Sequence, residues 1–292
     1  MYMQRTVSVI VPNYNHAPFL KERLHSIFNQ THQDIEVILL DDASTDDSVQ
    51  ILETYKNHPK VSHFIVNDSN TGSPFLQWKK GLELAVGQFV WIAESDDSCE
   101  LDFLEKQLAT LADSEAVVAK TVTFSKDGIN KEIVHPAFKD GTTPILDNDS
   151  LLYCPILNVS TTVFRAIDTE KLKQAAFTEF PIIGDRVFYY EFFQQEKIKF
   201  NNATTSYFRQ EGSGLSNLET KGLSYLTAYF YEHLRFIKWV QQTDATVNQT
   251  QVKEYMHRFF CRVRDRLSRS EKLSYQYFKL YLYYRFKIMQ VS

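Results

Sequence analysis

Apolar and polar positions alternate regularly along the first third of this chain. Short apolar runs of strand length are separated by longer segments in which apolar residues recur at helical spacing. The runs predict strands at 7–11, 35–40, 61–66 and 89–93, and the longer segments predict helices at 16–29, 45–57 and 73–86. Strands and helices that alternate through short loops predict a parallel sheet with helices on both faces.

The pattern is less regular after this part of the chain. Further strands are predicted at 117–124 and 160–164, with a turn at 126–128 and a polar run at 139–150 between them. Long connections in compact enzymes are often functional. We therefore expect this segment to form one side of a cleft.

Carboxylate side chains gather where two of the predicted strands end. Asp41 and Asp42 follow the second strand, and Glu94, Asp96 and Asp97 follow the fourth. In an open parallel sheet, the carboxyl ends of the strands face the crevice that binds ligands. Carboxylates this close repel one another unless a cation lies between them, and oxygen ligands suit Mg²⁺ or Mn²⁺. For the second group, an acidic turn that caps the next helix is the alternative.

Composition limits the class of protein. With 292 residues, the chain can form one large domain, or one domain with a helical extension. The three cysteines lack metal-ligand spacing, which indicates a reducing compartment, and the scattered histidines argue against zinc. No leader is recognisable, and no uncharged apolar stretch is long enough to span a bilayer. We therefore expect a cytoplasmic protein.

Charge is distributed unevenly along the chain. The formal net charge is −4, but residues 253–292 contain 10 basic and 3 acidic side chains, which leaves 22 basic and 33 acidic for the rest. The acidic body argues against a nucleic-acid partner, whereas the basic end requires an anionic one.

The basic end also has a helical pattern. One apolar stripe consists of Tyr255, Phe259, Val263 and Leu267, and a row of arginines beside it consists of Arg258, Arg262 and Arg266. Residues 275–289 are apolar and aromatic nearly all round, with Lys279, Arg285 and Lys287 interspersed. Basic helices with large aromatic side chains suit the surface of an anionic membrane, and we expect that surface to be the inner face of the cell membrane. A helical cap packed on the rest of the protein, with its basic residues solvated, is the alternative.

Several sequence blocks together resemble the family 2 glycosyltransferases, which have the GT-A fold. The blocks are Ser8–Asn15, Ser26–Thr31, Asp41–Asp46, Glu94–Asp97, Phe180–Asp185 and Tyr207–Ser213. The resemblance implies an α/β GT-A domain over 1–217, with a nucleotide-sugar-binding half at 1–112 and an acceptor-binding half at 113–217. The remaining residues, 218–292, are expected to form a helical extension.

The resemblance implies a site for a nucleoside-diphosphate sugar. Pro12, Tyr14 and Asn15 would line the nucleotide-sugar pocket, with the Tyr14 ring against the base. Asp42, or else Asp41, would accept a hydrogen bond from a pyrimidine imide N–H. That contact would favour a uridine or thymidine diphosphate sugar as the donor.

The remaining roles implied by the resemblance concern the metal and the reaction. Asp97 and Asp96 would hold Mg²⁺ or Mn²⁺ in an open crevice, with Asp96 also near the ribose or diphosphate, and the ion would stabilise the leaving diphosphate. Asp185 would be the general base that takes the proton of the acceptor hydroxyl, and a helix N-cap is its alternative role.

Four further residues are assigned lesser roles in the same way. Lys79 stands where an arginine that steadies the diphosphate is usual, and its alternative is a solvated charge. Trp78 would stack on the base or sugar, unless it is a core aromatic. Glu94 replaces the first acid of an aspartate-x-aspartate motif, so it is given a supporting role, as is Arg209 of the tyrosine-arginine block.

These expectations define a metal-dependent inverting glycosyltransferase. It would move a sugar to a hydroxyl of a glycan or lipid-linked oligosaccharide during synthesis of a cell-surface polysaccharide. A sugar-phosphate nucleotidyltransferase is one alternative, although residues 12–16 are not the glycine-rich basic loop usual in that class. A catalytically inert nucleotide-binding scaffold is the other alternative.

Overall fold

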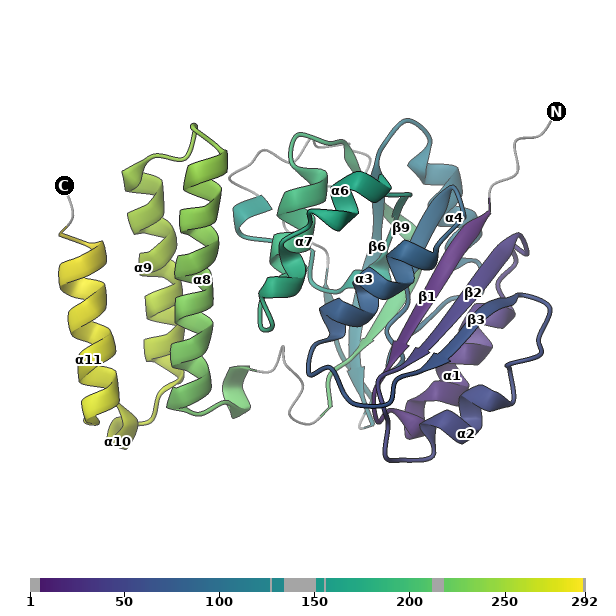
Figure 1. Ribbon diagram of the computed structural model, residues 1–292, viewed down its shortest axis with the longest axis horizontal. Coiled ribbons are helices and arrows are strands. Elements are labelled where there is room, and N and C mark those ends of the chain that lie inside the picture. The colour runs from purple at the N-terminus through teal and green to yellow at the C-terminus, as the bar shows by residue number, and fades with distance from the viewer. Residues whose placement is uncertain (1–5, 127, 134–150, 155, 212–217, 291–292) are drawn as a thin grey trace. The chain divides into compact units, whose positions relative to one another are not determined.

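A computed structural model describes residues 6–126, 128–154, 156–211 and 218–290 of the chain, apart from 134–150. The chain divides into two compact units, Met1–Gln210 and Glu211–Ser292 (Figure 1). The sequence predicted the boundary between residues 217 and 218. That position is the end of the segment 212–217, and this segment lies outside the described residues.

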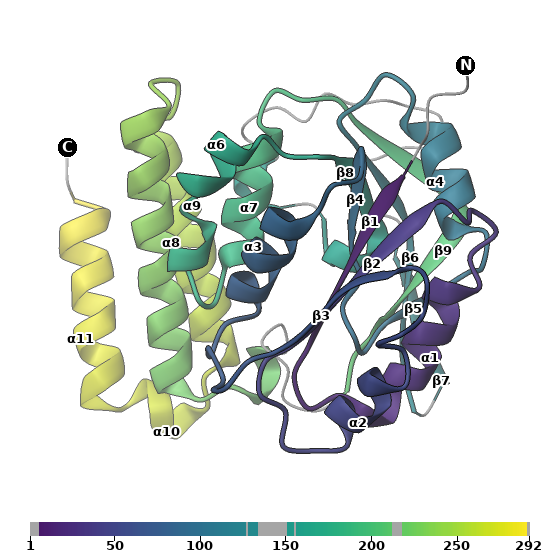
Figure 2. The same ribbon diagram turned by 45° about the vertical axis from the view of Figure 1, so that its right-hand side comes forward.

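Within the described part of the first unit, nine strands form one sheet in the order β3-β2-β1-β4-β8-β6-β9-β5, with β7 paired to β6 (Figure 2). They are β1 (Val7–Asn13), β2 (Ile35–Asp41), β3 (Val61–Val66), β4 (Phe89–Ile92), β5 (Ser98–Cys99), β6 (Ala116–Ser125), β7 (Gly128–Ile133), β8 (Thr162–Arg165) and β9 (Ile198–Arg209). Strands β1 to β4 are mutually parallel, whereas β8 runs antiparallel to both β4 and β6. The predicted mostly parallel sheet is confirmed.

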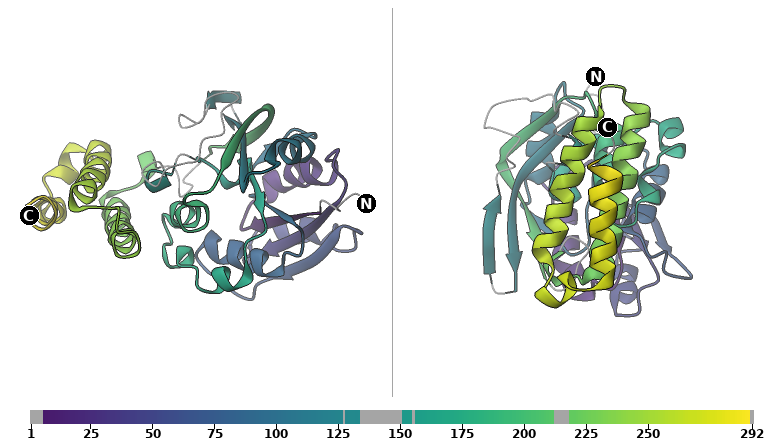
Figure 3. Two further views of the ribbon diagram at one scale, coloured as in Figure 1. Left: turned by 90° about the horizontal axis from the view of Figure 1, so that it is seen from above. Right: turned by 90° about the vertical axis from the view of Figure 1, so that its left-hand side faces the viewer.

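Helices cover both faces of this sheet (Figure 3). The helices of the first unit are α1 (Ala17–Phe28), α2 (Ser48–Glu53), α3 (Pro74–Leu84), α4 (Phe103–Leu111), α6 (Thr169–Lys173) and α7 (Gly184–Phe193), with 3₁₀ turns η1 (Val159–Thr161) and η2 (Phe177–Glu179). Val9 and Val11 of β1 belong to the core beneath α1, α2 and α4. Ile10 points the other way and packs against Gly81 of α3, because side chains alternate across a strand.

One predicted helix is shorter than expected. The helix predicted at 45–57 is α2, which covers only Ser48–Glu53. Asp46, one of its expected first residues, instead bonds the start of α1, where its carboxylate accepts the backbone N–H of Ala17 at 2.9 Å. The other strands and helices predicted in the first third are confirmed within a few residues.

The second unit is helical. Its helices are α8 (Leu223–Thr243), α9 (Gln249–Arg266), α10 (Arg269–Lys272) and α11 (Tyr275–Tyr283), with a 3₁₀ turn η3 (Leu218–Thr220) before α8 and a π-helical turn η4 (Tyr284–Ile288) after α11. The predicted apolar stripe of α9 is buried in the core of the second unit. There the ring of Phe259 stacks on the ring of His233, with the ring centroids 3.5 Å apart. Among the helices that the structure describes, we find none with the length and apolar character needed to cross a membrane.

Candidate active site

The ends of β1 and β2 are tied together by a buried carboxylate. Asp41 is fully buried, and its Oδ2 accepts hydrogen bonds from Asn13 Nδ2 at 2.6 Å and Ser44 Oγ at 2.7 Å. Its Oδ1 accepts the Ser44 backbone N–H at 2.8 Å. These bonds give Asp41 a role in shaping the loop after β2, which is paired with β1 in register at Asn13.

The loop after β1 holds its shape through Asn15. This residue has a positive φ of 56°, a conformation that asparagine tolerates better than most residues. Its side-chain oxygen accepts the Thr45 N–H at 2.7 Å, which links the loop to the one after β2. Pro12 is buried in β1, whereas Tyr14 is 43% exposed. Of these residues, Tyr14 therefore offers the ring surface that a base could contact.

Asp42 is also buried, and a different segment surrounds it. Its carboxylate accepts hydrogen bonds from Asn67 Nδ2 at 2.7 Å, Gln77 Nε2 at 2.8 Å and Thr71 Oγ1 at 2.7 Å. The Thr71 backbone N–H adds a further bond at 3.1 Å. A base that used this carboxylate would have to share or replace the bonds from Thr71.

The acidic loop after β4, residues 94–97, is anchored by the later half of the unit. Asp97 is only 1% exposed, and its two oxygens accept hydrogen bonds from Asn158 Nδ2 at 2.7 Å and the Arg209 backbone N–H at 3.0 Å. The expectation that Asp97 lies in an open crevice is therefore wrong, because the segments before β8 and at the end of β9 cover it. Asp96 is half-buried, and the described residues offer its carboxylate no side-chain donor at hydrogen-bonding distance.

Arg209 holds this loop from the other side. Its guanidinium lies 4.3 Å from the ring centroids of both Phe19 and Phe124, a cation–π arrangement with two rings. Its Nε donates to the Asp96 carbonyl oxygen at 2.8 Å, and its Nη2 pairs with Glu22 at 2.6 Å. Arg209, which was predicted to have a supporting role, thus contacts the backbone of the acidic loop with its guanidinium.

The half-buried Glu94 forms a hydrogen-bonded pair with the buried Trp78. Trp78 is 4% exposed, and its indole N–H donates to Glu94 Oε1 at 2.6 Å. Its ring packs edge-on against Phe75 and Phe188. Trp78 is therefore the core aromatic that the sequence left as an alternative, with one polar contact at the acidic loop.

The acidic loop carries more negative charge than its surroundings favour. Burial, reinforced by the neighbouring Asp96 carboxylate, raises the pKa of Glu94 to about 8 and that of Asp97 to about 6. Burial also raises the pKa of Asp96. A bound cation would relieve this repulsion and favour the ionised carboxylates.

Helix α3 connects the groups that the sequence assigned to donor binding and catalysis. Gln77 bonds Asp42 and Trp78 bonds Glu94, one residue apart in the helix. Near its start, the Phe75 ring packs against Gly184, where an added Cβ would lie 2.7 Å from the ring's Cε2 atom. The residue after Gly184 is Asp185. One helix therefore fixes the relative positions of all three groups.

Asp185 lies in the first turn of α7. The N-cap residue of that helix is Ile183, so the alternative role of Asp185 as an N-cap is wrong. Its Oδ1 accepts the Arg186 backbone N–H at 2.8 Å, and burial raises the pKa of the carboxyl while the Arg186 charge opposes the rise. A carboxylate whose pKa is raised toward neutrality is a better proton acceptor than an ordinary aspartate.

Lys79 is half-buried on α3. Its charge lowers the pKa of Glu191 on α7, against the raising effect of burial. Lys79 therefore adds positive charge near the junction of α3 and α7.

Sequence reasoning missed two residues beside the acidic loop. Arg23 of α1 is fully buried with its guanidinium 4.7 Å from the centroid of the Trp91 ring, and its charge lowers the pKa values of Glu94 and Asp97. Its position in the sequence could have indicated that Arg23 is buried, because it lies three positions after Leu20, on the apolar stripe of its helix. His16 Nδ1 lies 2.8 Å from Ser95 Oγ, and burial lowers the pKa of its imidazole.

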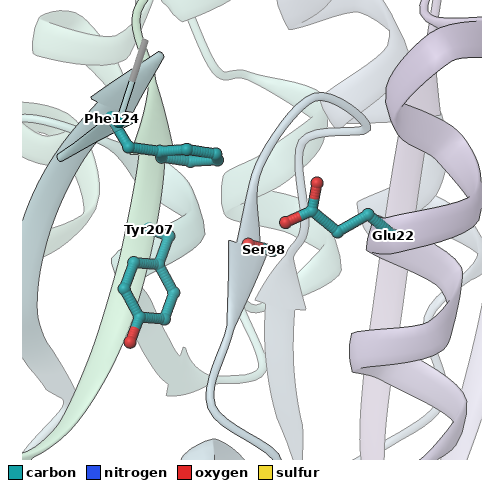
Figure 4. A pocket seen from close by; sticks show the side chains of 5 residues that line it. Glu22, Ser98, Phe124 and Tyr207 are labelled. Atoms are coloured by element: carbon teal, nitrogen blue, oxygen red, sulfur yellow. The ribbon is translucent and has the colours of Figure 1, made fainter. Parts of the chain in front are cut away.

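A pocket of about 260 Å³ lies beside Arg209 in the same unit. Its lining residues are Glu22, Ser98, Phe124, Gly128 and Tyr207. Phe124 and Glu22 point toward each other across it, and the Tyr207 ring stands nearly at right angles to Phe124 (Figure 4). An aromatic ring facing a carboxylate suits a sugar, whose C–H faces contact rings and whose hydroxyl groups donate to carboxylates, whereas the Tyr207 hydroxyl points away from Glu22 and donates to Glu100.

Comparison with known proteins places the chain in a family. The profile of the family described as Glycosyl transferase family 2 matches residues 8–173, which is more than half of the chain. The chain belongs to this family.

Two curated relatives illustrate its neighbourhood. The putative teichuronic acid biosynthesis glycosyltransferase TuaG of Bacillus subtilis (strain 168) is 35% identical over 122 residues, which are 42% of this chain and 46% of TuaG. The poly(ribitol-phosphate) beta-N-acetylglucosaminyltransferase TarS of Staphylococcus aureus (strain MW2) is 30% identical over 205 residues, or 63% of this chain and 35% of TarS. The chain thus matches less than half the length of each of these relatives.

Solved structures confirm the GT-A fold. The crystal structure of S. aureus TarS 1-349 in complex with UDP-GlcNAc has a TM-score of 0.63 at 21% identity, over 87% of this chain and 71% of the other. The mannosyltransferase PcManGT from Pyrobaculum calidifontis, in complex with GDP-Man and Mn²⁺, has a TM-score of 0.51 at 16% identity, over 81% and 64%. Identities this low support the fold alone.

Proposed function

We propose that the protein is a metal-dependent inverting glycosyltransferase that uses a UDP- or dTDP-linked sugar. The observation that carries the proposal is the connection of Asp42, the acidic loop and α7 through the single helix α3. Family membership favours sugar transfer over nucleotidyl transfer. TarS, a family relative, has been crystallised with UDP-GlcNAc, which supports a uridine nucleotide as the first donor to test.

The donor would bind across the ends of β1, β2 and β4. The exposed Tyr14 ring would contact the base, and Asp42 would accept the imide N–H once a bond from Thr71 is exchanged. Pro12 and Asn15 would shape the base pocket, as would Asp41 through the loop it holds. Lys79 would balance the charge of the diphosphate.

The residues present fit a divalent ion shared with the donor. Asp96 offers a carboxylate that the described side chains leave available, whereas Asp97 already accepts hydrogen bonds from Asn158, Ser160 and the Arg209 backbone N–H, so Asp96 would be the principal ligand with Asp97 beside it. In the described part of the chain, no group of three or more His, Cys, Asp or Glu side chains could hold a metal ion. Mg²⁺ in nucleotide sites commonly takes one or two carboxylates together with phosphate oxygens. When bound, Mg²⁺ or Mn²⁺ would stabilise the charge of the leaving diphosphate.

Asp185 would accept the proton of the attacking hydroxyl. Its Oδ1 is held by Arg186, which leaves Oδ2 to receive the proton as the hydroxyl oxygen bonds to the sugar carbon C1. The bond from C1 to the diphosphate breaks on the opposite face, so the configuration at C1 inverts. The pocket beside Arg209 would hold part of the acceptor glycan, between the Phe124 ring and the Glu22 carboxylate.

The acceptor would be a glycan or lipid-linked oligosaccharide of a cell-surface polysaccharide. TuaG is named for teichuronic acid biosynthesis and TarS for poly(ribitol-phosphate), and both names support this class of acceptor. A lipid-linked acceptor lies at a membrane, so peripheral contact through the basic C-terminal helices would bring the enzyme to it. The protein would then act at the inner face of the cell membrane.

A nucleotide panel tests the proposal. The melting temperature of the full chain is measured with UDP, dTDP and GDP, each with Mn²⁺ or with EDTA, because a ligand of the native state alone raises it. We expect UDP or dTDP to raise it only with Mn²⁺, and GDP to have little effect. Asp96→Asn should lose the response, with Asp168→Asn, at the exposed N-cap of α6, as a control away from the site. Equal responses to all nucleotides, or no need for the ion, would contradict the donor assignment.

A further inference from the structure

Helix α11 is anchored to the second unit by one face only. Leu280, Tyr284 and Ile288 are buried, and the Tyr284 ring stacks on Phe260 of α9 with centroids 3.9 Å apart and planes 2° apart. Tyr284 also shares a hydrogen bond of 2.5 Å between its hydroxyl and His257 Nδ1. These contacts fix how α11 and the following turn are rotated, and so determine which face points outward.

The outward face is strongly apolar. Tyr275 is 81% exposed, Phe278 54%, Tyr281 41% and Phe286 54%. Tyr275, Phe278 and Phe286 are three and eight positions apart, so they lie along one side of the helix and the turn that continues it. Exposed apolar patches of this kind mark interaction surfaces.

Positive charge accompanies this face. Lys279, Arg285 and Lys287 are exposed, and residues 273–292 contain neither Asp nor Glu in the sequence. A partner for this face must therefore accept aromatic side chains and cations together, and it must itself be anionic.

Several arginines of α9 differ from the cations of α11, because they pair with other side chains of the same unit. Arg266 pairs with Glu219 at 3.0 Å, and Arg264 pairs with Asp265 at 2.9 Å. The Arg262 guanidinium lies over the Phe259 ring, 5.3 Å from its centroid, and donates to the Tyr229 hydroxyl at 3.3 Å. These arginines partly offset acidic and aromatic groups of the same unit.

We propose that the outward face of α11 and its turn is the surface that docks on an anionic membrane. Aromatic side chains with a polar end are favoured at the level of the lipid headgroups, and Lys and Arg stems can lie along apolar surface while their charges reach the phosphates. A second copy of this chain would bring the same cations together without acids to pair them. This inference deepens the membrane contact proposed above and is independent of the transfer reaction.

Co-sedimentation with vesicles tests the assignment. The full chain is mixed with phosphatidylcholine vesicles that either contain or lack phosphatidylglycerol, at low and high salt. We expect binding to the anionic vesicles that weakens with salt, since screening shortens the reach of the charges. Lys279→Gln, Arg285→Gln and Lys287→Gln together should weaken it by about fivefold for each cation that reaches the surface.

A matched variant separates this face from net charge. The matched variant also loses three positive charges, but from α9 and α10, through Arg258→Gln, Arg264→Gln and Arg269→Gln. This variant should bind anionic vesicles nearly as the parent does. Phe278→Ser with Phe286→Ser keeps every charge and should also weaken binding. Circular dichroism of each variant confirms that the helices remain.

Two results would overturn the assignment. One is no binding by the parent at low salt, and the other is an equal loss in the two charge variants. If the parent does not bind and forms a dimer that the Phe278→Ser, Phe286→Ser variant dissociates, the face instead contacts a second copy of the chain. The melting response to UDP and Mn²⁺ is measured on the same samples. A failure there would count against the donor site and leave the membrane surface unaffected.

Discussion

Glu94 shows how one side chain couples the acidic loop to pH. Burial, reinforced by the neighbouring Asp96 carboxylate, raises its pKa to about 8 in the folded protein, from an ordinary value near 4.5, although the hydrogen bond from the Trp78 N–H opposes the rise. Between those values the folded state binds a proton that the unfolded state has lost. The free energy of unfolding therefore falls as pH rises through this range.

Glu94→Gln should flatten that dependence. The glutamine keeps an oxygen for the Trp78 N–H but cannot ionise, so the fall in stability between about pH 6 and 8 should largely disappear. The part due to Asp97, whose pKa is about 6, should remain at lower pH. Urea unfolding at a series of pH values measures the effect. The same slope in parent and variant would assign the proton to another group.

Asp185→Asn tests the general base. Asparagine preserves the size of the side chain and an oxygen for the Arg186 N–H, but it cannot accept the proton of the hydroxyl. We expect turnover to fall by roughly 10²- to 10⁴-fold, the usual contribution of a general base, with the affinity for UDP and Mn²⁺ unchanged. Initial rates and calorimetric titration separate the two quantities. Parent-like turnover would return Asp185 to a structural role.

The sequence predicted the types of residue in the site better than their contacts. It placed carboxylates after β2 and β4, but the hydrogen bonds of Asp97 come from residues 61 and 112 positions away. No local pattern in the sequence encodes such pairs. Arg23 was missed because a charged residue on an apolar helical stripe looks like an interruption, whereas here it is buried against Trp91.

At the scale of elements, α3 depends on two close approaches. Gly81 allows it to lie against Ile10 of β1, and Gly184 allows α7 to begin against Phe75 of α3. The role of α3 as the connector could not be predicted from the sequence, because its periodicity predicted only a helix.

Gly184→Ala should disturb this junction. The added Cβ would lie 2.7 Å from the carbonyl oxygen of Phe177 and against the Phe75 ring, so one of the two segments must move. Overpacking of this kind typically costs about 1–3 kcal/mol, and a displaced α7 would also lower turnover through Asp185. Chemical denaturation and initial rates measure both effects. Gly222→Ala is the control for mutation of a glycine as such, because an added Cβ there would come no closer than 3.8 Å to Glu271 Oε1 and its φ of −78° suits alanine.

Prediction of elements failed where loops compete with helices. The helix expected at 45–57 begins later because its expected first residues bond to other segments: the Thr45 N–H donates to Asn15 in the loop after β1, and Asp46 accepts the N–H of Ala17 at the start of α1. Local propensity favoured the longer helix. The bonds that hold the ends of β1 and β2 together outweighed it.

At the scale of the whole molecule, the uneven charge seen in the sequence corresponds to two compact units. The acidic residues lie mainly in the first unit, Met1–Gln210, whereas the basic excess lies in the second, Glu211–Ser292. The sequence indicated this division from composition and from the end of the family motifs. The sequence did not show which helix of the second unit carries the exposed aromatic face. The packing of Tyr284 on Phe260 shows that it is α11.

Hydrogen exchange on the full chain should show that the two units respond to different ligands. UDP with Mn²⁺ should slow exchange in the loops after β1, β2 and β4, because binding suppresses their local opening. Anionic vesicles should instead slow exchange in residues 275–288. Neither ligand alone should reproduce the other's pattern, and both together should give the sum. Protection of 275–288 by the nucleotide would show that the donor site and the exposed helix are coupled.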